Sequence, residues 1–375
     1  MDFALTEEQN AVRAFAAEVL GRLAQEPEVM AWGGMSAPAR ERLWDAFVAS
    51  DLLSIGLPEQ WSGSGGSVTE TALICHAVGH AGVPFPYDCT TPTVAAAVAR
   101  FGSDDLRASV LPRFAKGEVR VSMSALSAGP TAVLTARDGA FELSGAVSHV
   151  PAPVPLDMVL VPAALEPDGQ PRLVLLDLSG PGCDEVTQTQ ATDYTWEAQL
   201  RLTGAVVAPD RVLGGDDVDS FAWLRQRAIA AASATQVGLC VRAVELAALH
   251  VRERRQFGRP LSDFQAVTQR LADALIQLDV MDAALWRLVS QLETGADAGV
   301  AASLAKHIAS RSAPCVVRAA VHLHGGLGVD VTYPLALLAV MSKRLEGWLG
   351  GAGRHLEELG EQLAGAQALD ELLLA

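Results

Sequence analysis

The sequence predicts an α+β multidomain chain in three parts: an N-terminal α-helical domain over 1–118, a small middle β-barrel or β-sandwich domain over 119–218, and a C-terminal four-helix bundle over 219–375. Apolar residues recur at helical spacing in the first and last parts. Short β-rich runs separated by Gly, Pro and Asp fill the middle. The length of 375 residues exceeds one compact core and fits two or three packed domains.

The first part is predicted to open on a capped helix. Thr6 and Gln9 have the spacing of a capping box. The apolar residues that follow recur at helical spacing: Val12, Phe15, Val19 and Leu20. Further helices are expected over 39–50 and 69–79, because turn-forming residues cluster at 62–67 and 84–86 between and after them.

The middle part is expected to be all β. Five short runs have the composition of strands: 119–123, 141–143, 158–161, 173–178 and 199–202. From Ser220 onward, long segments rich in Ala and Leu return to helical periodicity, which predicts the bundle.

Composition excludes several classes of function. A net charge of −16 argues against nucleic acid, which proteins bind through Lys and Arg, and means that any anionic ligand needs a local basic patch. No run reaches eighteen apolar residues, so no membrane span is expected. The N-terminus lacks the basic region of a signal peptide, which predicts a cytoplasmic protein. Five scattered cysteines without CxxC spacing favour neither a metal site nor disulfides.

Two motifs carry the functional argument. Arg254 and Phe257 stand three residues apart at the expected end of a long helix, which would place a guanidinium and a ring on one face. Arginine suits a diphosphate, since it forks and stays charged, and a ring beside it covers a flat heterocycle. The segment His322–Gly328 strings glycines where a backbone approaches something bulky. Taken alone, the first motif is explained by a solvated helix end and the second by a helix C-cap. The two motifs together predict a dinucleotide held between helices.

From end to end the chain resembles the acyl-CoA dehydrogenase superfamily. Residues 5–9 are similar to its opening helix and 57–66 to its first long loop, and the two motifs above match its late motifs. The resemblance implies FAD buried between the β domain of one subunit and the bundles of the same and a neighbouring subunit. It further implies dehydrogenation of an acyl-CoA thioester, an obligate oligomer, and an electron-transfer flavoprotein or similar acceptor.

The resemblance also implies which residues hold the cofactor. Relatives grip a neighbour's FAD with positions that are largely present here: Arg254 for the pyrophosphate, Phe257 beside it, Gln265 a few positions on, His322 where most relatives have Gln, and Gly325 with Gly326 for the adenosine.

The base that removes the α-proton is missing at both positions where the family keeps it. Such a weakly acidic proton needs a carboxylate within hydrogen-bond reach. The usual position falls on Leu349, followed by Gly350, and the alternative falls on Ala228. Glu346 is the one candidate for a displaced base, although Lys343 at helical i,i+3 spacing would also explain it.

The positions that contact the flavin ring in relatives are altered as well. In the run 124–130, only the hydroxyl of Ser124 and an Ala-Gly pair remain. The run 145–151 offers His149 and Pro151 where relatives have a Trp and a Thr, and His149 is interpreted as a loop residue. Proline has neither an N–H nor a hydroxyl to give to a flavin.

This combination resembles the base-less partner in actinobacterial heteromeric (α2β2) acyl-CoA dehydrogenases of steroid side-chain degradation. We therefore predict a non-catalytic subunit that grips the FAD of a second acyl-CoA dehydrogenase-like subunit. Two alternatives stay open: a self-sufficient homotetrameric dehydrogenase that uses Glu346, and a non-redox protein that keeps only the fold.

Overall fold

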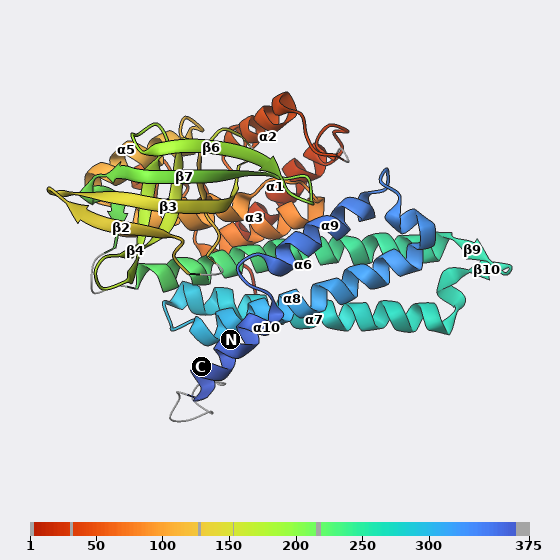
Figure 1. The fold of residues 1–375 in the computed structure, drawn as a ribbon. Helices are drawn as coiled ribbons and strands as arrows, with labels where there is room; N and C mark the ends of the chain where they lie inside the picture. Colours follow the sequence, from red (N-terminus) through yellow and green to blue (C-terminus); the bar gives the residue numbers. More distant parts are fainter. Residues whose placement is uncertain (1–3, 31–32, 127–128, 153, 215–218, 365–375) are drawn as a thin grey trace. The chain divides into compact units, whose positions relative to one another are not determined.

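The computed structural model describes residues 4–30, 33–126, 129–152, 154–214 and 219–364 (Figure 1). The chain forms two compact units, each assembled from separated stretches. The sheet unit comprises 33–71 and 84–228, and the bundle unit comprises 1–32, 72–83 and 229–375. Because N-terminal residues contribute to both units, the predicted domain boundaries at 118 and 218 stay predictions.

The sheet unit is built on one mixed sheet. Its strands are β1 Val121–Met123, β2 Ala132–Arg137, β3 Ala140–Pro151, β4 Met158–Leu165, β5 Gln170–Asp177, β6 Cys183–Gln190, β7 Trp196–Val207 and β8 Val212–Leu213. They follow the order β6-β7-β3-β2-β4-β5-β8, with β1 on β4. β1 and β2 pair in parallel with successive parts of β4, whereas the other pairs are antiparallel. The sheet is therefore open and mixed rather than the closed barrel that the sequence allowed.

The five expected strand runs all overlap strands, but β2, β6 and β8 were not expected. The sequence of β6, CDEVTQTQ, is mostly polar and lies at one end of the strand order, so it gives no apolar run to detect. The inner face of the sheet packs a continuous apolar core that includes Leu134, Leu143, Val159, Val174 and Leu200.

In the sheet unit, α2 begins at a capping serine, and aromatic side chains pack beside it. Ser36 accepts from the N–H of Ala39 at 3.3 Å to open α2 Ala37–Ala49. The rings of Phe47 and Phe85 stack with centroids 3.9 Å apart, and the hydroxyl of Tyr87 donates to a loop carbonyl. The remaining helical segments are η1 Glu59–Trp61, η2 Tyr87–Cys89, η3 Thr91–Ala95, α4 Ala96–Phe101, α5 Asp104–Ala115 and η4 Pro209–Arg211.

The bundle unit contains the long helices. They are α1 Glu7–Leu23, α3 Val68–Ala81, α6 Ser220–Glu253, α7 Gln265–Thr294, α8 Gly299–His324, α9 Pro334–Gly347 and α10 Ala352–Ala364, of which α3 and α6 begin in the sheet unit. A two-stranded hairpin, β9 Arg255–Gln256 with β10 Arg259–Pro260, and η5 Leu261–Asp263 link α6 to α7, and η6 Gly325–Val329 follows α8.

The capping box at Thr6 and Gln9 is confirmed, with both reciprocal bonds at 3.1 Å. The buried face of α1 is not the predicted one, however. Val19 and Leu20 are buried, but Val12 is not and Phe15 is 43 % exposed. Ala16, one residue after Phe15, occupies the buried position instead, so the small residue rather than the large one faces the core.

Close packing explains two glycines of the core helices. A Cβ on Gly79 of α3 would collide with the carbonyl oxygen of Thr235, and one on Gly238 of α6 with that of His76. The two helices therefore meet backbone to backbone. Among the described residues, α6 is the one helix apolar and long enough to cross a membrane, but 83 % of its most apolar window is buried, as in the core helix of a globular protein.

Candidate functional site

The arginine motif lies on a hairpin and not on a helix. α6 ends at Glu253, and the next residues form the β9–β10 hairpin (Figure 1). Its two central residues, Phe257 and Gly258, have φ values of 54° and 81°. Positive φ at both positions is the geometry of a type I′ turn. The prediction that Arg254 and Phe257 share one helical face is therefore wrong, because Gly258 permits the turn and Pro260 has no N–H to extend a helix.

The hairpin holds Phe257 out into solvent. This side chain is 90 % exposed, and its ring meets that of Phe264 edge-on at 6.0 Å. Arg259 lies over the other ring, 4.1 Å from the centroid of Phe264, and the N–H of Leu261 donates to the carbonyl of Arg254 at 2.9 Å. A bulky residue at positive φ is strained, and exposure offers no burial to offset that strain within this chain.

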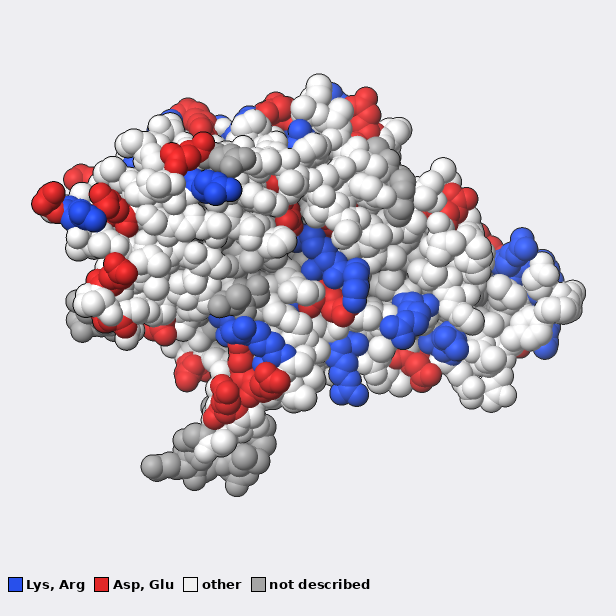
Figure 2. All heavy atoms as spheres, in the orientation of Figure 1, with Lys and Arg blue, Asp and Glu red and all other residues white. Residues whose placement is uncertain are grey.

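The hairpin also concentrates positive charge in an acidic protein. Four exposed arginines stand within eight residues, with Glu253 as the opposing charge: Arg252, Arg254, Arg255 and Arg259. Figure 2 shows Lys and Arg side chains around the hairpin end of the bundle unit. Guanidinium groups bind phosphate oxygens through paired, charge-assisted hydrogen bonds. This segment is the local basic patch that an anionic ligand of a chain with a net charge of −16 needs.

The glycine loop, Gly325–Gly328, contains three glycines that differ in what their missing side chain permits. Gly325 has φ 62° and ψ −136°, a conformation almost confined to glycine. Gly328 is needed for packing, since a Cβ there would lie 2.7 Å from the carbonyl oxygen of Val321. Gly326 has neither reason, because its Cβ would meet nothing within 4 Å. Contacts within the described chain therefore leave this backbone open to approach from outside.

The structure brings the hairpin and the glycine loop together through histidines. His250 lies one helical turn before Arg254, and its ring stacks on that of His324 with centroids 4.4 Å apart. His324 is the last residue of α8, directly before the loop. His322 and Gln265 are exposed, the first in the last turn of α8 and the second as the first residue of α7. The stack was not predicted, because it forms between residues distant in sequence.

Both positions expected to carry the base are apolar and buried. Leu349 follows the end of α9, is 0 % exposed and has φ 63°. Its carbonyl accepts a hydrogen bond from Nε2 of the buried His355 at 2.9 Å. Ala228, within α6, is 2 % exposed. The carboxylate of Glu346 pairs with Nζ of Lys343, its partner at i,i+3, at 2.9 and 3.0 Å.

A buried lysine holds the turn that follows α9. Lys306, on α8, is 1 % exposed. Its Nζ donates to the carbonyl of Leu345 at 2.7 Å and to the hydroxyl of Ser310 at 2.9 Å. That hydroxyl donates in turn to the carbonyl of Glu346 at 3.0 Å. The cation therefore satisfies the last carbonyls of α9, where the helix dipole is negative.

In the sheet unit, one hydroxyl on β1 and one directly after this strand are buried without partners among the described residues. Ser122 and Ser124 are 0 % and 2 % exposed, and neither Oγ has a hydrogen-bond partner among the described residues. They lie two residues apart, so they share one face of the strand. A buried hydroxyl without a partner costs free energy unless a ligand or water satisfies it. Ser127 and Ala128 of the same run lie outside the described residues.

His149 belongs to a strand, so its interpretation as a loop residue is wrong. It has φ 56° and sits at an irregularity in the pairing of β3 with β7, where the register shifts between Val147 and Val150. Its Nδ1 lies 2.9 Å from a carboxylate oxygen of Glu197 on β7. Such bulges re-aim a side chain, here toward the neighbouring strand. Pro151 ends β3 and is buried.

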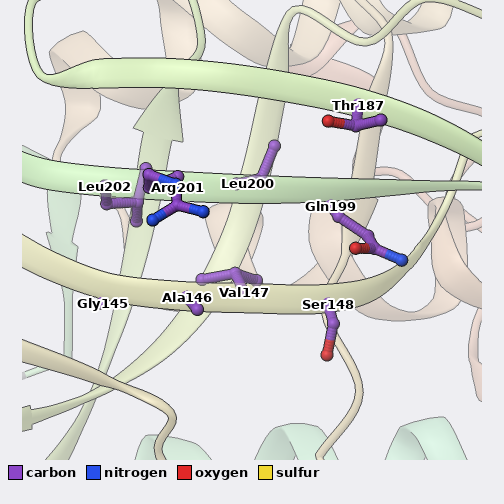
Figure 3. Close-up of a pocket in the computed structure, with 9 residues that line it drawn as sticks. All are labelled: Gly145, Ala146, Val147, Ser148, Thr187, Gln199, Leu200, Arg201 and Leu202. Carbon is purple, nitrogen blue, oxygen red and sulfur yellow. The ribbon is translucent and has the colours of Figure 1, made fainter.

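A shallow cavity of roughly 430 Å³ lies beside this irregularity, across three strands (Figure 3). Its lining comes from β3, β6 and β7: Gly145, Ala146, Val147, Ser148, Thr187, Gln199, Leu200, Arg201 and Leu202. These nine residues include no aromatic side chain.

Comparisons with known proteins agree with the architecture. Residues 6–118 match the family model for the acyl-CoA dehydrogenase N-terminal domain, and residues 224–364 match the model for the acyl-CoA dehydrogenase C-terminal domain. The chain is 32 % identical to acyl-CoA dehydrogenase FadE27 of Mycobacterium tuberculosis (strain ATCC 25618 / H37Rv), over 86 % of this chain and 88 % of the relative.

Two solved structures are similar over nearly the whole chain. A variant of the Tcur3481-Tcur3483 steroid ACAD is 31 % identical, with a TM-score of 0.88, over 96 % of this chain and 98 % of that chain. The ChsE4-ChsE5 complex from Mycobacterium tuberculosis is 28 % identical, with a TM-score of 0.90, over 98 % and 100 %. The predicted fold class and the resemblance stated from the motifs are confirmed.

The same fold is also known with the predicted cofactor. A FAD complex of PigA superposes with a TM-score of 0.85 at 21 % identity, over 97 % of this chain and 99 % of that chain. At this identity the likeness shows the fold alone. The cofactor prediction, FAD, is confirmed at the level of the family, and the residues of this chain that would hold it stay predictions.

Proposed function

The chain belongs to the acyl-CoA dehydrogenase family, and we propose that it is the non-catalytic subunit of a heteromeric, FAD-dependent member that grips the FAD of a catalytic partner. One observation carries the proposal. The base position is a buried leucine, Leu349, whereas the hairpin and the glycine loop stay exposed and open.

The reaction of the family cannot be completed by the groups at the usual base positions. A carboxylate must lie within hydrogen-bond reach of the α-proton of the thioester. Leu349 and Ala228 have no group that accepts a proton. Glu346 does, but its two oxygens pair with Lys343, one turn along α9. The base is therefore proposed to come from a second chain.

The exposed segments have the chemistry of an FAD-gripping surface. Arg254 would pair with the diphosphate, Phe257 would cover an apolar part of the cofactor, and the backbone at Gly325 and Gly326 would approach the adenosine. Gln265 and His322 would add hydrogen bonds at the edge, since both are exposed and polar. FAD, when bound, supplies the acceptor for the hydride from the β-carbon. This chain would bind and orient it.

Two similar structures support a proposal for the substrate and the partners. One is a variant of the Tcur3481-Tcur3483 steroid ACAD, and the other is the ChsE4-ChsE5 complex. We propose a second acyl-CoA dehydrogenase-like subunit as partner and the CoA thioester of a steroid side chain as substrate. Electrons would pass to an electron-transfer flavoprotein or similar acceptor, in the cytoplasm.

One observation favours a second candidate, a self-sufficient dehydrogenase with its own flavin. The unpartnered hydroxyls of Ser122 and Ser124 are groups that a flavin edge could satisfy. Against this candidate, the chain has His149 and Pro151 where relatives have a Trp and a Thr at the flavin ring, and Glu346 is held in an ion pair. The first proposal therefore accounts for more of the structure.

The ratio of FAD to protomer tests both candidates. The chain is purified alone and after co-expression with the acyl-CoA dehydrogenase-like chain encoded nearest to it. The proposal expects no stable flavin alone, one FAD per pair of chains together, and loss of activity when the partner's base is replaced by Gln. One FAD per chain in the lone protein, with activity, would contradict it and favour the second candidate.

A further inference from the structure

Three side chains from three separate segments meet at the base of the proposed cofactor grip. His250 lies in the last turns of α6, His324 ends α8, and Tyr333 precedes α9. The two imidazoles stack at 4.4 Å, and Nε2 of His324 lies 3.1 Å from the hydroxyl oxygen of Tyr333. His324 is only 6 % exposed. All three belong to the bundle unit.

The hydrogen bonds of His324 define its protonation. Nδ1 lies 2.8 Å from the carbonyl oxygen of Ala320, which only accepts, so Nδ1 carries the hydrogen. In the neutral ring Nε2 is then free to accept a hydrogen bond from the hydroxyl of Tyr333. A second proton would remove that acceptor and place a buried charge against the ring of His250.

The surroundings favour the neutral forms of His250 and Tyr333. Burial lowers the pKa of His250, and the neighbouring His324 and Arg254 lower it further, while Glu253 opposes them. Burial also raises the pKa of Tyr333, with Glu253 acting in the same direction and Arg242 against it. The charged groups around the stack are thus two arginines and one glutamate, and they give an added proton little compensation.

The position of the stack connects the hairpin to the glycine loop. His250 lies one helical turn before Arg254, and His324 directly precedes Gly325 and Gly326. Tyr333 anchors the chain where it leaves η6. The stack therefore sets the separation between the guanidinium that would meet the diphosphate and the backbone that would meet the adenosine.

We propose that His250, His324 and Tyr333 form a proton-sensitive joint that holds the arginine hairpin and the glycine loop in the geometry that grips FAD. This inference rests on the proposed function and adds a regulatory property to it. Because burial and its neighbours lower the pKa of His250, charge enters the stack only in acid, below the ordinary imidazole range, and there the rings separate and FAD retention falls. A direct role of protonated His250 toward the diphosphate would have the opposite sign.

The test measures the dissociation constant of FAD from the assembled complex between pH 8 and pH 5.5, by flavin fluorescence. Wild type is compared with His324→Phe, which keeps a ring but cannot titrate, and with Tyr333→Phe, which loses only the hydroxyl. His80→Asn is the control, since His80 is a histidine of α3 that pairs with Glu245 away from the stack.

Wild type and His80→Asn are expected to lose about tenfold in affinity over this range, the effect of one pKa unit of linkage. His324→Phe should bind a few-fold more weakly at pH 8 and show a weaker pH dependence than wild type, from His250 alone. Tyr333→Phe should be weaker at pH 8 but keep a pH dependence. A purely structural role would lower affinity without flattening the profile.

Several outcomes overturn the joint. One is that His324→Phe shows the same pH profile of FAD binding as wild type. The other is that wild type binds FAD more tightly in acid. In both cases FAD still binds, so the proposed function survives. No FAD binding by the wild-type complex at any pH overturns both proposals. If the variants do not fold, the imidazole ¹⁵N spectrum of the wild-type chain decides, because a protonated Nε2 on His324 at pH 8 is incompatible with the joint.

Discussion

Two residues of this chain share an unfavourable backbone conformation but not their surroundings. Phe257 and Leu349 both have positive φ, at 54° and 63°. Phe257 lies at the tip of the hairpin and is 90 % exposed, whereas Leu349 is completely buried after α9. The strain at Leu349 is offset by burial and by the hydrogen bond from His355. The strain at Phe257 has no such offset within the hairpin, which is what a residue that serves another molecule would show.

The comparison distinguishes the turn after α9, which is packed into the fold, from the hairpin and the glycine loop, which are exposed and are proposed to bind the cofactor. At the turn after α9, Leu349 is a closed apolar position, and Lys306 and His355 bind backbone carbonyls beside it. At the hairpin and the glycine loop, charge, an exposed ring and an open Gly326 remain. Substitutions in the first region should therefore change stability, and substitutions in the second should change cofactor retention.

The largest effect is expected for Leu349→Glu. The new carboxylate would replace a fully buried side chain, and an unpaired buried charge costs more than about 3 kcal/mol of unfolding free energy. We expect a lower midpoint of urea unfolding and no dehydrogenase activity in the lone chain, because the flavin-ring positions are also altered. Leu349→Met, of similar volume, is the control and should cost less than about 1.5 kcal/mol. Activity of the lone Leu349→Glu chain would contradict the half-site proposal.

Arg254→Ala should come next. In the assembled complex, removing one charge-assisted hydrogen bond to a diphosphate should weaken FAD binding by about 1.5–3 kcal/mol. The unfolding free energy should change by less than about 0.5 kcal/mol, since the side chain is exposed. Arg252→Ala, an exposed arginine of the same patch on α6, serves as the control. If Arg254→Ala retains FAD as well as wild type does, this hairpin does not bind the cofactor.

The glycine loop offers a matched pair. Gly328→Ala should destabilise the chain by about 1–3 kcal/mol, because its Cβ would press on the carbonyl of Val321. Gly326→Ala should leave the unfolding midpoint within about 0.5 kcal/mol of wild type but weaken FAD binding in the complex. Thermal unfolding and FAD titration distinguish the two. Unchanged FAD binding by Gly326→Ala would mean that nothing approaches this backbone closely.

A small gain in stability is expected for Phe257→Asn. Asparagine suits the first central position of a type I′ turn, so relief of strain should stabilise the chain by up to about 1 kcal/mol. The same change removes the exposed ring and should weaken FAD binding in the complex. A variant that is both less stable and unchanged in binding would reverse the interpretation of the exposed strain.

Residue patterns predicted the helical and β regions, but they did not predict the hairpin. Arg254 and Phe257 at a separation of three are compatible with a helix, and Phe-Gly is not the Asn-Gly or Asp-Gly pair that usually predicts a type I′ turn. β6 was missed because it is polar. Phe15 was assigned to the core because periodicity does not decide between a phenylalanine and the alanine beside it.

The candidate site was predictable only where one segment carries the information. Arg254, Gln265 and the glycines were identified from local motifs. The His250–His324 stack and the contacts of Lys306 with Leu345 join residues more than thirty positions apart. The signal for Lys306 was a single lysine inside an apolar helical pattern, and only the tertiary structure shows which carbonyls it meets.

Because Lys306 is buried, the rate of its chemical modification reports how often the packing of the bundle helices opens. The protein has three lysines, and the other two, Lys116 and Lys343, are exposed. An amine-reactive reagent should modify those two within its ordinary reaction time and should reach the third only when α9 lifts from α8. The rate of that slow modification, read by mass spectrometry, would measure how often the turn carrying Leu349 opens, with and without the partner chain.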